Sequence, residues 1–204
     1  MPPGRLITFE GIDGSGKTTQ VRMLADKLQA AGRKVVLTRE PGGAPGAEAV
    51  RKLLVEGETD RWSPETEILL FTAARRDHVE RTIGPALERG AIVLCDRFID
   101  STRVYQGVAR SDLRAMVDEV HRIAIDLEPD LTLVLDVAPE EARARDAARG
   151  SAEDRFERFG ADFQTRLRAG FLTLAAEFPD RCRVVDADGA PEAVAARVAT
   201  AAGL

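Results

Sequence analysis

One short segment near the N-terminus constrains the fold of this chain more than any other. Residues 11–18 read Gly-Ile-Asp-Gly-Ser-Gly-Lys-Thr and fit the pattern G-x-x-x-x-G-K-[ST]. Its glycines let the backbone wrap a phosphate, so that successive N–H groups face the anion. Apolar β-forming residues precede the segment, and residues 21–28 carry apolar side chains at helical spacing. A strand, a glycine loop and a helix in this order predict a nucleoside triphosphate site, the P-loop.

Two residues of this loop carry specific chemistry. Lys17 can reach a β- or γ-phosphate, and the Thr18 hydroxyl can bind Mg²⁺. The alternative is a glycine-rich turn with a surface lysine, and the strand and helix patterns on both sides argue against it. The residues predicted to bind the triphosphate are Gly11, Ile12, Asp13, Gly14, Ser15, Gly16, Lys17, Thr18 and Thr19.

Composition bounds the class of protein. With 204 residues, of which 44% are hydrophobic and 31% charged, the chain suits a single domain spanning 1–204 with a substantial core. A net charge of −5, without a basic tail or stripe, argues against nucleic-acid and membrane partners. No apolar run reaches the ~20 residues of a membrane span, and residues 1–4 do not resemble a signal peptide. We expect a cytoplasmic protein with Cys95 and Cys182 as buried free thiols.

Short apolar runs alternate with helical patterns along the whole chain. Nearly continuous apolar strands are typical of a parallel sheet covered on both faces, so the chain is predicted to be an α/β, doubly wound domain. The expected strands are 6–10, 34–38, 91–96, 131–137 and 183–186. The expected helices are 17–31, 47–55, 64–89 with a break near Pro85, 111–127, 139–148, 160–178 and 191–201.

Ligands in such sheets bind beyond the carboxyl ends of the strands. At one of these ends the sequence reads Cys95-Asp96-Arg97. The Asp96 carboxylate can hold Mg²⁺ or its waters, and Arg97 can clamp a phosphate with two hydrogen bonds. The alternative is a charged pair that ends a strand, and the position within a P-loop sheet favours the functional interpretation. The other strand ends carry Glu10, Thr38, Asp136 and Asp186.

Two further groups of side chains can recognise a nucleotide. Phe71 and Arg75 lie four apart on a predicted helix, hence on one face, where a ring and a guanidinium could bind a base. Ser101, Thr102, Tyr105 and Gln106 follow the Asp96 strand and offer hydroxyls and an amide. The alternatives are a core Phe71 with a solvated Arg75, and Ser101 as the N-cap of a short helix.

An arginine-rich segment at about 143–158 is the candidate lid. It carries Arg143, Arg145, Arg149, Arg155 and Arg158 and is interrupted at Gly150. A mobile segment of this kind over a P-loop neutralises charge during phosphoryl transfer. The alternative, left equally open by these residues, is a solvated helix with ion pairs four residues apart.

Together these segments resemble bacterial thymidylate kinase, a family of P-loop nucleoside monophosphate kinases. The segments Thr-Arg-Glu-Pro-Gly-Gly and Tyr-Gln-Gly are distinctive of that family, and the others are shared more widely among P-loop kinases. The resemblance implies the reaction ATP + dTMP → ADP + dTDP with Mg²⁺ as cofactor. It also implies a P-loop NTPase three-layer sandwich with a five-stranded parallel sheet, and a homodimer. The matching segments are residues 9–19, 38–43, 70–75, 96–98, 101–102, 105–107 and 129–132.

The resemblance also implies roles for the matching positions. Phe71 would stack on thymine, Arg75 would bond its carbonyl edge, and Thr102 and Gln106 would help to read the base. Tyr105 would crowd the sugar 2′ position. The remaining implied contacts are Asp13 on the 3′-hydroxyl side, Arg51 and Arg97 on the acceptor phosphate with Ser101 beside them, Thr18 and Asp96 on the metal, and Asp186 with Ala187 near the adenine.

One departure from part of the family concerns Gly14, where some thymidylate kinases carry an arginine in the P-loop. A catalytic arginine should then come from the lid, and Arg149 and Arg155 are the candidates. The predicted catalytic residues are therefore Lys17, Arg97, Arg149 and Arg155.

Two rival functions remain open. One is a P-loop kinase that acts on another nucleoside monophosphate. The other is a GTPase-type switch, because residues 186–189 spell its D-x-x-G motif, although no N-K-x-D motif follows.

Overall fold

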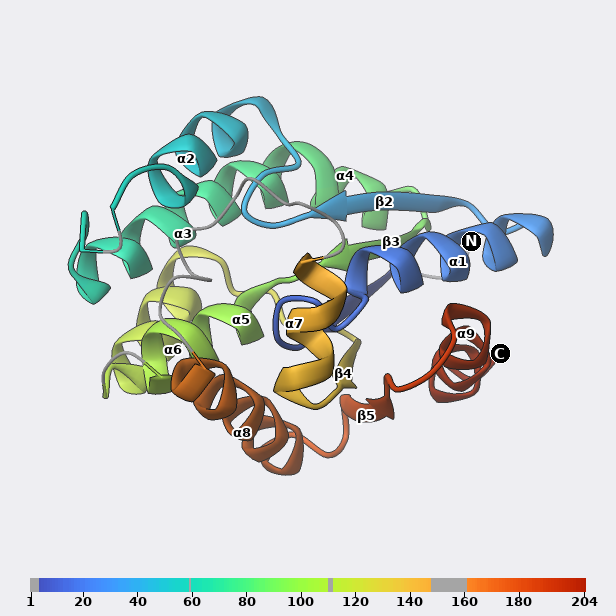
Figure 1. Cartoon of the computed structure of the whole chain (residues 1–204). Helices are drawn as coiled ribbons and strands as arrows, with labels where there is room; N and C mark the ends of the chain where they lie inside the picture. Colours follow the sequence, from blue (N-terminus) through green and yellow to red (C-terminus); the bar gives the residue numbers. More distant parts are fainter. Residues whose placement is uncertain (1–3, 59, 110–111, 148–160) are drawn as a thin grey trace.

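Five short strands form one parallel sheet in the order β2-β3-β1-β4-β5. They belong to a computed structural model that describes residues 4–58, 60–109, 112–147 and 161–204 (Figure 1). The register pairs Phe9 with Asp96 and Glu10 with Val134, so the carboxyl ends of the three central strands meet at one edge of the sheet. The predicted α/β fold is confirmed. The strands are β1 (Arg5–Glu10), β2 (Val35–Arg39), β3 (Ile92–Asp96), β4 (Leu131–Asp136) and β5 (Cys182–Asp186).

Helices connect the strands and cover both faces of the sheet (Figure 1). Among the described residues, none of them combines the length and apolarity that a membrane crossing requires. The helices are α1 (Lys17–Ala30), α2 (Pro45–Val55), α3 (Pro64–His78), α4 (Gly84–Glu88), α5 (Ile99–Val104), α6 (Arg114–Ala124), α7 (Pro139–Ala147), α8 (Ala161–Glu177) and α9 (Pro191–Ala201), with π-helical turns η1 (Val79–Ile83) and η2 (Tyr105–Ala109).

The long helix predicted over 64–89 changes geometry earlier than Pro85. The π-helical turn η1 separates α3 from α4, and Pro85 lies in the first turn of α4. The backbone stays helical from α3 through η1 into α4, so Pro85 lies inside a continuous helical path, and the wider π-helical turn before it accommodates a residue that cannot donate a hydrogen bond. The break predicted near Pro85 is thus a change of helical geometry over the five residues of η1.

A short helix follows β3 that the expected helices do not include, and it starts two residues before the Ser101 of the alternative interpretation. Helix α5 begins at Ile99 with Phe98 as its N-cap residue, so Ser101 lies inside the helix and the alternative of a Ser101 N-cap is wrong. The acceptor for the N–H groups at the start of α5 comes instead from strand β1. The Glu10 carboxylate at the end of β1 accepts hydrogen bonds from the backbone N–H groups of Phe98 (2.8 Å) and Ser101 (3.2 Å). Because this partner is distant in sequence, local capping rules do not find it.

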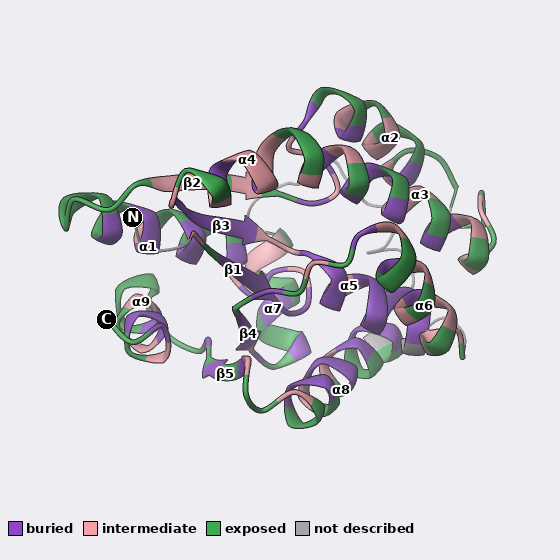
Figure 2. Cartoon of the chain, turned by 180° about the vertical axis from the view of Figure 1, so that it is seen from behind, coloured by how far each residue is buried: buried purple, intermediate pink, exposed green. Residues whose placement is uncertain are grey.

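Alternate residues of the central strands face opposite sides of the sheet, as a pleated strand requires. In β1, Ile7 and Phe9 join a core cluster with α1, α8 and α9. Leu6 joins a second cluster with side chains of α3, α4, α5 and α6. Figure 2 shows buried residues on the central strands and on the helix faces turned toward them. Two packed cores thus hold the carboxyl edge of the sheet rigid.

Candidate active site

The P-loop turns between β1 and α1 through three glycines in left-handed conformations. The φ angles are 134° at Gly11, 78° at Gly14 and 92° at Gly16, a region that other residues rarely adopt. Gly16 is the N-cap residue of α1 and supplies no side-chain acceptor. The first N–H groups of α1 are therefore available to an anion bound in front of the helix.

Lys17 is folded back over its own loop. Its Nζ donates to the carbonyl oxygens of Ile12 (2.8 Å) and Gly11 (3.1 Å), and the side chain is buried. Burial lowers the pKa of Lys17 to about 8, and the nearby positive charge of Arg97 adds to this effect. A triphosphate bound in the loop would offer Nζ a stronger, negatively charged partner.

Thr18 and Asp96 meet at the mouth of the loop. The Thr18 hydroxyl donates to Oδ2 of Asp96 across 2.5 Å, so the two predicted metal ligands lie side by side. Among the described residues, no group of three or more His, Cys, Asp or Glu side chains could hold a metal ion. A hydroxyl beside one carboxylate suits Mg²⁺, which keeps several waters and takes other ligands from substrate phosphates.

Arg97 connects β3 to the P-loop. Its Nη2 lies 2.5 Å from Oδ1 of Asp13, and its Nη1 donates to the Ser101 hydroxyl (2.8 Å). Tyr105 donates to the other Asp13 oxygen across 3.0 Å. Arg97 has a φ of 68°, a left-handed conformation that costs about 1–3 kcal/mol for a non-glycine residue. This network holds the strained arginine in place and points it across the cleft.

Two carboxyl groups in this network, the partly exposed Asp13 and the buried Glu10, differ in pKa. Burial acts to raise the pKa of Asp13, but the positive charges of Arg97 and Lys17 hold it below its usual value. For Glu10, burial and the nearby Asp100 carboxylate raise the pKa from 4.5 to about 7, against the opposing effect of Arg97. Oε2 of Glu10 accepts from the Ser101 hydroxyl across 2.5 Å. Asp13 is therefore a fixed negative charge, whereas Glu10 titrates near neutral pH.

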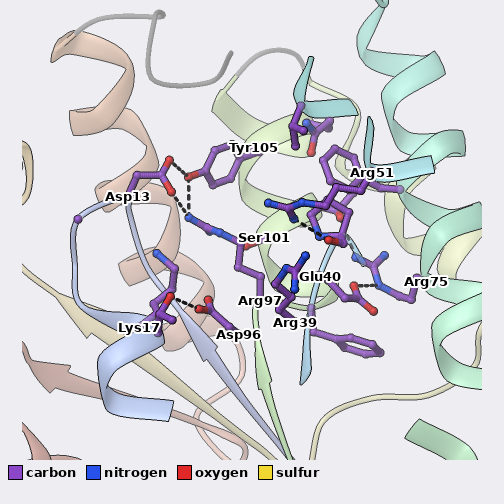
Figure 3. A pocket seen from close by; sticks show the side chains of 18 of the residues that line it. Asp13, Lys17, Arg39, Glu40, Arg51, Arg75, Asp96, Arg97, Ser101 and Tyr105 are labelled. Atoms are coloured by element: carbon purple, nitrogen blue, oxygen red, sulfur yellow. Dashed lines mark hydrogen bonds and ion pairs between the residues drawn. The ribbon is translucent and has the colours of Figure 1, made fainter. Parts of the chain in front are cut away.

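A pocket of about 300 Å³ extends from the P-loop to α3 (Figure 3). At its far end Arg75 donates from Nε to Oε2 of Glu40 (2.8 Å) and from Nη2 to the Thr102 hydroxyl (3.1 Å). Nη1 of Arg75 is buried and has no hydrogen-bond partner among the residues that the structure describes. Phe71 lines the same end, one turn earlier on α3. The pocket thus has an aromatic wall and a buried donor at one end, and the P-loop at the other.

Comparisons with known proteins identify the family of the chain. The thymidylate kinase family model matches residues 9–198. The chain belongs to the thymidylate kinase family. A thymidylate kinase from Dinoroseobacter shibae is 65% identical over 196 residues, covering 96% of this chain and 95% of that protein. One from Jannaschia sp. is 61% identical over 203 residues, covering 100% and 97%. The family predicted from the sequence is confirmed.

A solved structure gives the same result for the fold. The crystal structure of thymidylate kinase from Ehrlichia chaffeensis superposes with a TM-score of 0.80 at 36% identity and covers 98% of each chain. The prediction of an enzyme of this family is therefore confirmed, and the predicted P-loop sandwich with a five-stranded parallel sheet is the fold observed.

The structure brings together every residue that the thymidylate kinase resemblance placed around the acceptor. These residues come from the P-loop, α2, α3, the end of β3 and the segment that follows it. Thr18, Asp96 and Lys17 line the same pocket. The acceptor residues that line it are Asp13, Arg51, Phe71, Arg75, Arg97, Ser101, Thr102, Tyr105 and Gln106.

Some lining residues had no predicted role. Glu40 is buried beside Arg75, and the Pro41 carbonyl accepts a hydrogen bond from Nη1 of Arg51 (2.6 Å). Both belong to the family segment after β2, and their place at the carboxyl end of a strand was a signal that could have found them. Pocket-lining residues without a predicted role are Arg39, Glu40, Pro41, Val55, Phe98 and Asp146.

Helix α7, from the segment predicted as the lid, packs directly on the P-loop. A Cβ at Gly14 would collide with the carbonyl of Ala142, so α7 sits where a side chain at Gly14 would project. Arg145 turns away from the pocket and donates to the Ala187 carbonyl (2.9 Å). Arg143 lies 3.7 Å from Glu140 on the exposed surface of α7. The candidate lid arginines Arg149 and Arg155, and also Arg158, lie outside the described residues.

The two residues loosely assigned to adenine lie at the end of β5. Asp186 is exposed and pairs with Arg197 (2.9 Å), whereas Ala187 is buried. Neither lines the pocket. The D-x-x-G sequence that they begin is therefore the turn between β5 and α9, and the family match removes the reason to interpret it as a GTPase motif.

Proposed function

We propose that this chain transfers the γ-phosphoryl group of ATP to the phosphate of dTMP, giving ADP and dTDP, with Mg²⁺ as cofactor. The observation that carries this proposal is one pocket that joins the P-loop at Lys17 to the Phe71–Arg75 face of α3. Membership of the thymidylate kinase family supports the choice of donor and acceptor.

The far end of the pocket is the proposed base site. Phe71 stacks on thymine, and Nη1 of Arg75 donates to a carbonyl oxygen of the base. Its burial without a protein partner in the described structure supports this role, because an unmet buried donor costs about 1–3 kcal/mol. Thr102 and Gln106 lie beside it and complete the recognition of the polar edge.

The middle of the pocket holds the sugar and the acceptor phosphate in this proposal. Tyr105 occupies the space of a 2′-hydroxyl and so favours deoxyribose, while Asp13 faces the 3′-hydroxyl. Arg97 and Arg51 bind the acceptor phosphate. The hydrogen bonds that Arg97 makes with Asp13 and Ser101 support this role, since they aim the guanidinium toward the P-loop before any substrate binds.

In this reaction the protein forms no covalent bond with either substrate, and its role is to position the two phosphates and neutralise their charge. An oxygen of the dTMP phosphate attacks the γ-phosphorus, and the bond to the bridging oxygen of the departing ADP breaks. The attacking phosphate is already anionic near neutral pH, because its second pKa is near 6. Lys17 and Arg97 then hold the two phosphates in line and neutralise charge. Mg²⁺, bound at Thr18 and Asp96, would neutralise the β- and γ-phosphate oxygens.

Arg149 or Arg155 supplies the remaining positive charge in this proposal, from a lid at about 143–158 that excludes water. The packing of α7 on the P-loop supports a lid that starts over the site.

We also propose that the enzyme is located in the cytoplasm.

We also propose that the enzyme is a homodimer. Leu69 on α3 and Ile123 on α6 are 54% and 68% exposed, and the two helices are joined by a hydrogen bond from Arg76 to the Ala124 carbonyl (2.9 Å). A second copy on this face would bury both side chains.

Sedimentation equilibrium tests the proposed dimer and should give twice the chain mass. Leu69→Glu with Ile123→Glu should give the monomer, whereas Leu204→Glu, at an exposed position in the C-terminal tail, should leave the dimer intact. A wild-type monomer contradicts the proposal.

An acceptor panel tests the function. With ATP as donor, ADP release is measured with dTMP, dUMP, dCMP, dGMP or no acceptor, and the dTMP reaction is repeated with GTP. We expect dTMP to be the best acceptor, with dUMP weaker by about tenfold because one methyl group is worth ~1–3 kcal/mol. Phe71→Ala and Arg75→Ala should raise KM for dTMP more than KM for ATP. A different best acceptor, or nucleotide hydrolysis that needs no acceptor, contradicts the proposal.

A further inference from the structure

A continuous chain of hydrogen bonds, partly buried at Thr38 and buried from His78 to Arg75, lies behind the base end of the pocket. It runs from the Thr38 hydroxyl to Nε2 of His78 (2.6 Å), from Nδ1 of His78 to Oε1 of Glu40 (3.0 Å), and from Oε2 of Glu40 to Nε of Arg75 (2.8 Å). His78 is 0% exposed, and Glu40 and Arg75 are also buried. His78 does not line the pocket, and nothing in the proposed chemistry uses it.

The hydrogen bonds along this chain use both ring nitrogens of His78. The carboxylate oxygen Oε1 of Glu40 accepts from the Nδ1–H of His78. The other ring nitrogen, Nε2, shares a hydrogen bond with the Thr38 hydroxyl. Each oxygen of Glu40 is thereby assigned to one partner, Oε1 to His78 and Oε2 to Arg75. The ring therefore fixes the rotation of the carboxylate that Arg75 binds.

The orientation of Arg75 decides where its remaining donor points. A guanidinium is planar, so fixing Nε on Glu40 and Nη2 on Thr102 also fixes Nη1, the buried donor at the base site. The guanidinium carbon also lies 5.1 Å from the centre of the Phe98 ring. A rotation of the Glu40 carboxylate would move Nη1 relative to the base.

The position of His78 explains why a histidine suits this role. It is the last residue of α3, one turn after Arg75, and it reaches across to the segment that follows β2. That segment passes so closely that a Cβ at Gly43 would collide with Nε2 of His78 and with the Thr38 hydroxyl. The Gly43 carbonyl is held by the Thr82 hydroxyl (2.8 Å). The ring thus bridges two walls of the pocket, α3 and the segment that carries Glu40.

We infer that His78 is a positioning residue for recognition of the acceptor base. It acts through Glu40 to hold the Arg75 guanidinium in register with a carbonyl group of the base, and it touches no substrate. The inference rests on the proposed role of Arg75 as the donor to the base.

Two substitutions at His78 separate positioning from packing. In His78→Asn the amide nitrogen occupies the place of Nδ1 and can still donate to Glu40. In His78→Gln the amide lies farther out, near Nε2, and the hydrogen bond to Glu40 is lost. His121→Gln is the matched control, because His121 is the other histidine of the chain, is also buried on a helix, and lies outside the active-site pocket.

The readout is the preference for a carbonyl at position 4 of the base. It is the ratio of kcat/KM for dTMP to that for 5-methyl-dCMP, which carries an amino group there. We expect His78→Gln and Arg75→Ala each to lower this ratio by about tenfold, the equivalent of ~1.4 kcal/mol. KM for ATP should not change. His78→Asn and His121→Gln should keep most of the wild-type ratio, and adding His78→Gln to Arg75→Ala should lower it no further.

The outcomes distinguish the inference from the function on which it rests. If Arg75→Ala lowers the ratio and His78→Gln does not, the positioning role is overturned and the base contact stands. If Arg75→Ala leaves the ratio unchanged, the contact of Arg75 with the carbonyl at position 4 fails and the inference fails with it. Should His78→Gln not fold, Thr38→Val removes only the outer hydrogen bond of the chain. It should lower the ratio in the same direction, and an unchanged ratio overturns the inference.

Discussion

Arg97 and Asp13 are joined across 2.5 Å, which links the end of β3 to the P-loop at a point where both face the pocket. Tyr105 and Ser101 complete the network on either side of this pair. The proposed binding group for the acceptor phosphate is therefore attached to the loop that binds the donor. The two halves of the site form one rigid unit, which suits a reaction that depends on the alignment of two phosphates.

Arg97→Lys tests this unit. Lysine keeps the positive charge but cannot bond Asp13 and Ser101 while it also clamps a phosphate with two parallel hydrogen bonds. We expect kcat/KM for dTMP to fall by about 100-fold in steady-state assays, with KM for ATP changed much less. Arg122→Lys, on the exposed surface of α6, is the control. Activity within about twofold of the wild type in Arg97→Lys would remove Arg97 from the mechanism.

Lys17 predicts a dependence of ATP affinity on pH. Because burial lowers its pKa to about 8, Lys17 of the free enzyme becomes neutral as the pH rises above that value. Bound ATP favours the charged form, so binding at alkaline pH should take up a proton, and the affinity should fall by up to about tenfold per pH unit. Calorimetry in buffers of different ionisation enthalpy measures this uptake. A wild-type enzyme without proton uptake, or Lys17→Met with an unchanged pH profile, contradicts the assignment.

Glu10 predicts a dependence of stability on pH. Its pKa is raised by burial and by Asp100 from 4.5 to about 7, so the folded protein holds a proton that the unfolded chain has released. The free energy of unfolding should therefore fall as the pH rises between these values, by roughly 3 kcal/mol from this residue. Denaturant unfolding of wild type and Glu10→Gln across this range measures the difference. A stability difference that is constant with pH would show that Glu10 does not titrate there.

The lid arginines can be separated by kinetics. Arg155→Ala should lower kcat far more than it raises KM for dTMP, because a charge that meets the transferring phosphoryl group matters most in the transition state. Arg149→Ala is the paired variant. If only KM moves in Arg155→Ala while kcat falls in Arg149→Ala, then Arg149 takes the catalytic role. If kcat is unaffected in both variants, the proposal of a catalytic lid arginine is wrong.

The central strands and the P-loop could be predicted because their signals are local. Every predicted strand is present, with boundaries that differ by at most one residue, since nearly continuous apolar runs bounded by turns admit few other interpretations. The glycine pattern within residues 11–18 by itself indicates a tight loop, and Gly11, Gly14 and Gly16 have the positive φ angles that such a loop requires.

Contacts between distant segments could not be predicted in the same way. The Glu10 carboxylate that caps α5, and the pairing of Glu40 with Arg75 and His78, join residues that are far apart in the sequence. Alone, each is a charged or polar residue of a kind that is usually exposed, and only the fold places them in contact. The absence of α5 from the expected helices, and the error in the alternative that made Ser101 an N-cap, have the same cause.

The central claim is that the γ-phosphoryl group of ATP moves to dTMP in this pocket. The most direct measurement is quantitative ³¹P NMR of a reaction that contains the enzyme, Mg²⁺, ATP and dTMP. We predict one dTDP for each ADP formed, little inorganic phosphate, and no turnover when dTMP is omitted. Formation of ADP with inorganic phosphate in place of dTDP, or at the same rate without dTMP, would contradict the account.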